Sequence, residues 1–245
     1  DAWDAVRVVF RSLHRGEPAL ALPALGGLFD EKSCPWLDRS TLANRDFFET
    51  MKLLRWVTLD GVTAAIDYKN LGTEELGSVY EGLLELVPVV DVVARKFAFV
   101  GLTNVANDRK DTGSYYTPDA LVQSLIKTAL DPVIEETLAK HPQNPTTALL
   151  NLSVIDPTCG SGHFLLAAAR RIAEALSLAR SVDGVVTPDG YREALRDVIQ
   201  HCIYGVDINP LAVELARMAL WLEGFSRGKP LSFLDHHLKV VCLWP

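Results

Sequence analysis

An apolar run that ends in a carboxylate and a glycine-rich loop constrains the fold of this chain more than any other feature. The run covers residues 149–155 and is followed by the segment Asp156-Pro157-Thr158-Cys159-Gly160-Ser161-Gly162. Beyond it, the alanine- and leucine-rich residues 163–180 predict a long helix. Glycines after a strand permit positive φ angles and let a ligand approach the backbone, and the helix amino end presents free N–H groups to an anion. The pattern therefore predicts a ligand-binding loop between a buried strand and a helix.

Predicted helices and buried strands alternate from residue 111 onwards. Helices are expected over residues 118–138, with a restart at Asp131-Pro132, and over 163–180, 188–199 and 210–222; strands are expected over 149–155, 202–206 and 238–243, and a loop over 141–147. Strands that alternate with helices indicate a parallel α/β sheet, whose ligands bind at the carboxyl ends of the strands. We therefore assign residues 111–245 to one α/β domain.

The first 110 residues show a different pattern and are expected to form a separate, mainly helical region. Apolar residues recur at helical spacing over residues 2–13 and around 44–56, and a third helix is predicted from Thr73 to Leu84. Residues 87–100 are compatible with either strands or a helix.

Composition and charge exclude several classes of protein. With 49% apolar and 22% charged residues, the chain has the profile of a globular protein and not of a disordered one. No apolar stretch approaches the roughly 18 residues of a membrane helix, and no signal peptide is recognisable. The four cysteines form no CxxC pattern, so we expect reduced thiols, no metal site and a cytoplasmic location. The net charge of −7 argues against DNA binding by this chain alone, because DNA-binding surfaces are usually basic.

Three ligands compete for the glycine loop. A nucleoside triphosphate requires a Lys-Ser/Thr ending, but His163-Phe164 follows Gly162. A dinucleotide requires a third glycine, where Leu165 stands, and an acid about 20 residues further on. S-adenosylmethionine fits best: the helix end can bind its carboxylate, Asp156 can face its ammonium group, and Asp207, at the end of the next strand, can accept hydrogen bonds from its ribose.

The sequence also resembles the N6-adenine DNA methyltransferases in three motifs. Residues 156–164 (Asp-Pro-x-Cys-Gly-Ser-Gly-x-Phe) resemble their motif I, residues 204–210 (Tyr-Gly-Val-Asp-Ile-Asn-Pro) their motif II, and residues 112–118 (Thr-Gly-Ser-Tyr-Tyr-Thr-Pro) their motif X. Motif X upstream of motif I is the gamma order, shared by type I modification subunits and fused type IIG restriction–modification enzymes. A helical segment at residues 76–84 is similar to one in the large fused enzymes and in relatives from phage-defence systems, so the resemblance covers about residues 70–240.

The resemblance implies a Rossmann-like S-adenosylmethionine-dependent methyltransferase domain with a partial parallel sheet. The residues that it places around the cofactor come from the three motifs: Ser114, Tyr116, Thr117 and Pro118 at the methionine end, Asp156, Pro157, Thr158, Cys159, Gly160 and Gly162 in the loop, and Asp207 and Ile208 at the ribose and adenine. Cys159 could also suggest a nucleophile, but a small packing residue fits better because no general base is identifiable beside it.

Two departures from the family pattern limit what this chain is expected to do. The catalytic motif Asn/Asp/Ser-Pro-Pro-Tyr/Phe is absent, because the sequence contains no Pro-Pro pair. In the family this motif binds the flipped adenine, so no catalytic residue is assigned and the chain is expected to be an inactive piece of a longer enzyme. The acid that often follows the third strand is also absent, since residues 240–243 read Val-Val-Cys-Leu.

The functional prediction is therefore part of a site-specific adenine-N6 DNA methyltransferase of a restriction–modification or phage-defence system. Double-stranded DNA would be bound by other parts of the protein, together with a nuclease domain or with restriction or specificity subunits, and no membrane partner is expected. Two alternatives stay open: a methyltransferase that acts on protein or RNA, and a non-catalytic subunit that keeps the methyltransferase fold as a scaffold.

Overall fold

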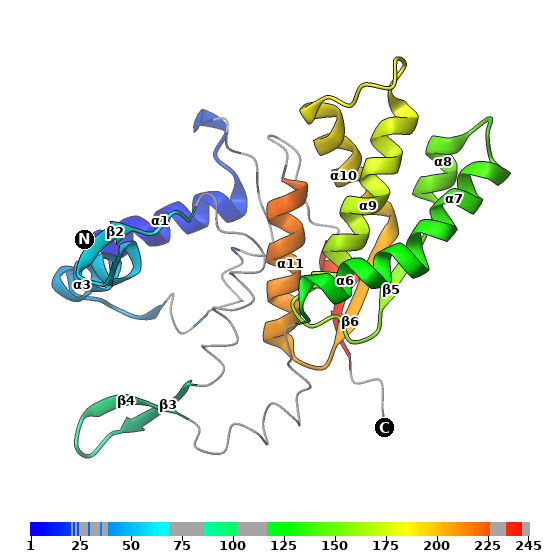
Figure 1. Cartoon of the computed structure of the whole chain (residues 1–245). Helices are drawn as coiled ribbons and strands as arrows, with labels where there is room; N and C mark the ends of the chain where they lie inside the picture. The colour runs from blue at the N-terminus through cyan, green and yellow to red at the C-terminus, as the bar shows by residue number, and fades with distance from the viewer. Residues whose placement is uncertain are drawn as a thin grey trace. The chain divides into compact units, whose positions relative to one another are not determined.

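The computed structural model describes residues 1–20, 22, 24, 29, 35, 39–68, 86–101, 117–225 and 234–241 (Figure 1). These residues fall into two compact units, one within residues 1–68 and the other within residues 86–225 and 234–241. Among the described residues, every buried apolar side chain belongs to the second unit. The hydrophobic core therefore lies where the sequence places the glycine loop.

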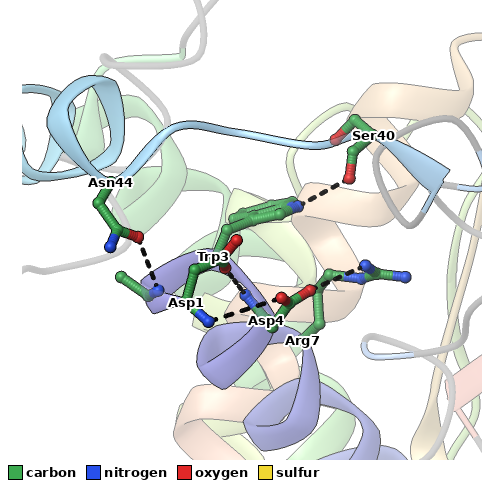
Figure 2. Close-up of polar contacts among 7 residues, drawn as sticks. Asp1, Trp3, Asp4, Arg7, Ser40 and Asn44 are labelled. Atoms are coloured by element: carbon green, nitrogen blue, oxygen red, sulfur yellow. Dashed lines mark hydrogen bonds and ion pairs between the residues drawn. The ribbon is translucent and has the colours of Figure 1, made fainter.

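The described elements of the first unit are two longer helices, one 3-10 turn and a β-hairpin. In chain order these are α1 (Ala2–Arg15), η1 (Pro18–Leu20), α3 (Asn44–Arg55), β1 (Trp56–Leu59) and β2 (Val62–Ala65). Figure 2 shows two hydrogen bonds that join the start of α1 to the region where α3 begins. The Trp3 indole N–H donates to the Ser40 carbonyl at 3.2 Å. The Ala2 amide donates to the Asn44 side-chain oxygen at 2.9 Å.

Two antiparallel hairpins accompany the helices in the described part of residues 1–110. β1 and β2 are joined by Asp60-Gly61, both with positive φ angles, 51° and 79°. An Asp-Gly pair with two positive φ angles is the turn that matches the twist of a two-stranded hairpin. The second hairpin pairs β3 (Leu86–Asp91) with β4 (Lys96–Gly101). The helices predicted at residues 2–13 and 44–56 are confirmed, while the one predicted from Thr73 to Leu84 lies outside the described residues.

A continuous helical stretch opens the described α/β part of the second unit. It consists of α6 (Asp119–Leu125), the π-helical turn η3 (Ile126–Leu130) and α7 (Asp131–Lys140). Pro132 has no amide hydrogen and its ring would clash with the carbonyl of residue 128 in a regular helix, so a wider turn before it keeps the helix unbroken. The helix begins at Asp119 with Pro118 in the N-cap position, one residue later than the sequence predicts.

The next segment corrects two of the predicted elements. Residues 145–150 form α8 (Pro145–Leu150), where a loop and the start of a strand were expected. The strand β5 is confined to Val154–Asp156. Leu149 is fully buried, and a short apolar run of this kind is compatible with either a buried strand or a buried helix.

The second unit also contains a parallel sheet, whose described strands are three in the order β5-β6-β7. The chain leads from β5 through α9 (His163–Arg180) and α10 (Pro188–Cys202) to β6 (Ile203–Asp207), and then through α11 (Pro210–Gly224) and α12 (Leu234–His237) to β7 (Leu238–Val240). The prediction of alternating helices and parallel strands is confirmed here. The third strand is shorter than predicted, and residues 242–243 lie outside the described residues.

Three helices pack on this sheet and supply most of the core. α9, α10 and α11 contact one another as well as the strands, and Figure 1 shows them side by side. Their side chains that are fully shielded from solvent include Leu165, Ile172, Leu176, Val198, Ile199, Val213 and Leu220. The helical stretch before the sheet packs against α9 through α6 and α8. Within it, η3 contacts both α6 and α7, and α7 contacts α8. The described part of the chain holds no helix long and apolar enough to cross a membrane.

Candidate functional site

Two aspartates lie at the carboxyl ends of neighbouring parallel strands. Asp156 is the last residue of β5 and Asp207 the last of β6. In the strand register Asp156 is paired with Gly205, so Asp207 extends two residues further along the same edge of the sheet. This is the edge at which parallel α/β sheets bind their ligands.

The loop between β5 and α9 is attached to β6 by two backbone amides. The Cys159 amide donates to the Val206 carbonyl at 2.9 Å. The Gly160 amide donates to a carboxylate oxygen of Asp207, Oδ2, at 2.8 Å. The other carboxylate oxygen, Oδ1, accepts from the Asn209 amide at 2.8 Å. Asp207 therefore joins the glycine loop to the segment that leads into α11.

Asp207 retains the capacity to bind a ligand in this position. Each oxygen of an ionised carboxylate has two lone pairs, and the two backbone amides use one on each oxygen. Because both bonds are to a charged acceptor, they hold the side chain in one orientation more strongly than neutral hydrogen bonds would. The carboxylate can thus accept hydrogen bonds from a pair of hydroxyl groups without reorganising.

Asp156 occupies a partly buried position at the same edge. One of its carboxylate oxygens accepts from the Thr158 amide at 3.0 Å. Burial raises the pKa of the Asp156 carboxyl, the nearby charge of Asp207 raises it further, and the hydrogen bond from Thr158 opposes both effects. A cationic group bound beside the two aspartates would relieve their mutual repulsion.

Two glycines of the loop have left-handed backbone angles, but their surroundings differ. Gly162 has a φ of +84°, and a Cβ atom there would lie 2.9 Å from the Ala216 Cβ on α11. Gly160 has a φ of +52°, and nothing lies within 4 Å of the place where its Cβ would be. The loop is therefore closely packed against α11 at Gly162 and open at Gly160, where a ligand can approach the backbone.

The amino end of α9 could hold an anion. Gly162 is the N-cap residue, and no side chain of the described residues caps the helix there. The first amides of a helix have no acceptor within the helix, and together with the helix dipole they attract negative charge. A carboxylate next to the loop would satisfy these amides.

The surroundings of Cys159 favour a packing role. Its side chain is only 5% exposed. Burial, and then the charges of Asp156 and Asp207, raise the pKa of its thiol to about 12. A thiol that stays protonated at neutral pH is a poor nucleophile, which agrees with the interpretation of Cys159 as a small packing residue.

The remaining predicted residues are placed unevenly. Pro157, Thr158 and Ile208 are exposed at the same edge of the sheet, with 55% of the Ile208 side chain open to solvent. Ser114 and Tyr116 lie outside the described residues. Thr117 and Pro118 directly precede α6, whose first residue has its carboxylate oxygen 3.6 Å from the His163 Nε2. The structure thus brings the start of α6 next to the amino end of α9.

Two residues important for this arrangement were not predicted to have a role. Gly205 in β6 has no room for a side chain, because a Cβ there would lie 2.7 Å from Leu165 of α9 and 3.0 Å from the Cβ of Cys159. A glycine within a strand pattern is a known sign of close approach and could have indicated this contact. His163 contacts Asp119 across 44 positions of sequence, and no local signal announces such a pair.

Comparisons with known proteins show which family and which relatives the chain resembles. The family model described as N-6 DNA Methylase matches residues 90–233. A protein of Methanocaldococcus jannaschii that bears the name of a type II restriction enzyme and methyltransferase is 26% identical over 84% of this chain. The adenine-specific methyltransferase PglX of Streptomyces coelicolor is 28% identical over 63% of the chain. The aligned regions make up only 19% and 10% of these two relatives.

Proposed function

We propose that this chain, which belongs to the N-6 DNA methylase family, forms the S-adenosylmethionine site of a DNA methyltransferase that modifies N6 of adenine. The observation that carries the proposal is the position of Asp207, whose two carboxylate oxygens accept from the Gly160 and Asn209 amides. This contact fixes the glycine loop and the acid at the end of β6 as one preformed unit. In the proposal, residues 111–245 with the sheet β5-β6-β7 are part of a Rossmann-like methyltransferase domain.

The chemical groups at the sheet edge fit the cofactor. S-adenosylmethionine has an amino acid end with an ammonium and a carboxylate, a positively charged sulfonium, a ribose diol and an adenine. The uncapped amino end of α9 suits the carboxylate, and Asp156 suits the ammonium. Asp207 suits the ribose diol, and the exposed Ile208 offers an apolar surface to the adenine.

The other residues assigned to the cofactor belong to the loop and to the segment before α6. Pro157, Thr158, Cys159, Gly160 and Gly162 shape the loop around the methionine end, with the open space at Gly160 as the point of approach. Ser114, Tyr116, Thr117 and Pro118 are assigned to the other side of the methionine end. The assignment of Ser114 and Tyr116 rests on the motif alone.

The chain contributes binding and orientation to methyl transfer. The bound cofactor would supply a methyl group that is activated by the positive sulfur. The preformed loop and the two aspartates would hold that group in place and complement its charge, so that little reorganisation is needed when the target amine approaches. The groups that accept hydrogen bonds from the target amine and stack on the adenine are assigned to other parts of the protein, because this sequence holds no Pro-Pro pair. We therefore expect cofactor binding, and no methyl transfer, from this chain by itself.

The proposed substrate and partners are bound by parts of the protein other than this chain. Double-stranded DNA is expected to be bound by other parts of the protein, because this chain has a net charge of −7. The name of PglX, an adenine-specific methyltransferase, supports adenine as the target. The name of the Methanocaldococcus jannaschii relative, a type II restriction enzyme and methyltransferase, supports a role in restriction–modification. A nuclease domain or restriction and specificity subunits would complete such a system in the cytoplasm.

Calorimetric titration of this chain with S-adenosylmethionine tests the proposal. Binding in the micromolar range corresponds to about −8 kcal/mol, and an Asp207→Ala variant should lose most of it, because both the ribose acceptor and the loop contact disappear. Asp197→Ala is the matched control: this aspartate of α10 pairs with Arg180 and makes no contact with the loop in the described residues. Equal binding by the Asp207 and Asp197 variants, or no binding by the folded unmodified chain, would contradict the proposal for this chain.

A further inference from the structure

The contact between His163 and Asp119 joins two segments that the sequence separates. His163 is the first residue of α9 and directly follows Gly162 of the loop. Asp119 is the first residue of α6 and directly follows Thr117 and Pro118. The His163 Nε2 lies 3.6 Å from an Asp119 carboxylate oxygen, which is within ion-pair distance when the imidazole is protonated.

The surroundings of the pair favour a positioning role. The His163 side chain is only 14% exposed, whereas Asp119 is 50% exposed. The same carboxylate oxygen of Asp119 also accepts from the Gln123 side chain at 3.2 Å, one turn along α6, which restrains its orientation. Val122, one turn after Asp119 on the same face of α6, is fully buried, so this face of the helix is attached to the core beside the pair.

We propose that His163 is a positioning residue, which holds the Thr117–Pro118 segment beside the glycine loop through Asp119 and so sets the methionine end of the cofactor site. The inference rests on the proposed function, because in it the pair sets the distance between two segments that contact the same ligand. His163 needs no contact with the cofactor in this role. It fixes the amino end of α6 relative to the amino end of α9.

A second ion pair between the same helical stretches provides a matched control. The Arg171 Nε on α9 donates to an Asp131 carboxylate oxygen at the start of α7, at 2.6 Å. Arg171 lies eight residues after His163, which is about 12 Å along the helix. Both pairs join α9 to the α6–α7 stretch, but only the His163–Asp119 pair lies at the glycine loop. Loss of either pair should therefore affect the stability of the fold, but only loss of the His163–Asp119 pair should affect the affinity for the cofactor.

The test is a double-mutant cycle on ligand affinity. His163→Ala, Asp119→Ala and the double variant are compared with Arg171→Ala, Asp131→Ala and their double variant. An ion pair with one half-exposed partner is worth up to about 1 kcal/mol when the imidazole is charged, so each variant at the loop should weaken S-adenosylmethionine binding about twofold to fivefold. The double variant should lose no more than the single ones, because they remove the same contact. The Arg171–Asp131 cycle should leave the affinity unchanged.

A second ligand distinguishes a positioning role from a general loss of structure. 5′-Methylthioadenosine contains the adenosine part and lacks the amino acid end, so its affinity should be the same in all variants of the His163–Asp119 cycle. Unchanged S-adenosylmethionine affinity in these variants, or an equal loss for both ligands, would overturn the inference and leave the proposed function standing. No binding by the folded unmodified chain would overturn both. If His163→Ala disturbs folding, Asp119→Ala alone decides the matter, because the Asp119 side chain is half exposed.

Discussion

Substitution of Gly162 by alanine should destabilise the second unit by two separable effects. The first is the backbone conformation: with φ at +84°, an L-residue costs about 1–2 kcal/mol. The second is steric, because the new Cβ would lie 2.9 Å from the Ala216 Cβ and 3.2 Å from its Cα. Overpacking of this kind typically costs about 1–3 kcal/mol. We expect a total loss of about 2–5 kcal/mol in the free energy of unfolding.

Gly160→Ala is the control that separates the two effects. Its φ of +52° carries the same conformational cost, but nothing lies within 4 Å of its Cβ position. It should therefore lose only about 1–2 kcal/mol. The difference between the two variants measures the contact with α11.

A compensating substitution makes the reasoning sharper. Ala216→Gly removes the atom that the new Cβ at position 162 would meet, at a cost of about 1 kcal/mol for a glycine within a helix. In the double variant most of the steric loss should disappear, because only the contact with the backbone Cα of residue 216 at 3.2 Å remains, which gives a favourable coupling of up to about 1–3 kcal/mol between the two sites.

Hydrogen exchange measured by mass spectrometry provides the assay. Peptides from α9 and β6 report the free energy of opening in the part of the second unit that surrounds the loop. Equal losses in Gly160→Ala and Gly162→Ala, or additive effects of Gly162→Ala and Ala216→Gly, would refute the close packing of the loop against α11.

Two further predictions concern the charges around the loop. Because the pKa of Asp156 is raised, its ionised form destabilises the folded state. Asp156→Asn should therefore raise the melting temperature at pH 7 and should also weaken S-adenosylmethionine binding. The gain in melting temperature should fade as the pH falls through the raised pKa towards the ordinary value of 3.8. A melting-temperature difference that grows as the pH falls would contradict this sign. Burial raises the thiol pKa values of Cys159 and Cys202 to about 12. Both thiols should therefore resist iodoacetamide at pH 8 in the native chain and react after denaturation. Fast alkylation of either cysteine in the native chain, measured by peptide mapping, would contradict the buried position of that side chain.

The helices of the second unit were the most predictable elements, because their signals are local. Thr187 followed by Pro188 predicts the start of α10, and its side chain does accept from the Gly190 amide at 3.1 Å. Residues 163–180 were predicted as a helix, and α9 has these bounds. The hairpin at residues 56–65 could also have been predicted, since Asp60-Gly61 is a strong turn signal. The sequence analysis predicted only the helix that precedes it.

Predictions failed where burial and not periodicity decided the structure. The apolar residues before β5 carry no period that distinguishes a helix from a strand, and the chain uses part of them in α8. Only the packing of Leu149 in the core fixes that choice. The role of Gly205 also depends on a neighbour, because its missing side chain makes room for Leu165 and Cys159.

The sequence by itself determined the glycine loop, the strand ends with Asp156 and Asp207, and the order of the elements around them. These features depend on the conformational preferences of residues that are adjacent in the chain. The tertiary structure decided which distant groups meet: the Gly160 amide and the Asp207 carboxylate, 47 positions apart, and His163 and Asp119, which belong to different helices. Such contacts follow from strand pairing and helix packing, which bring residues together according to the burial of the whole core and not according to any pattern along the chain.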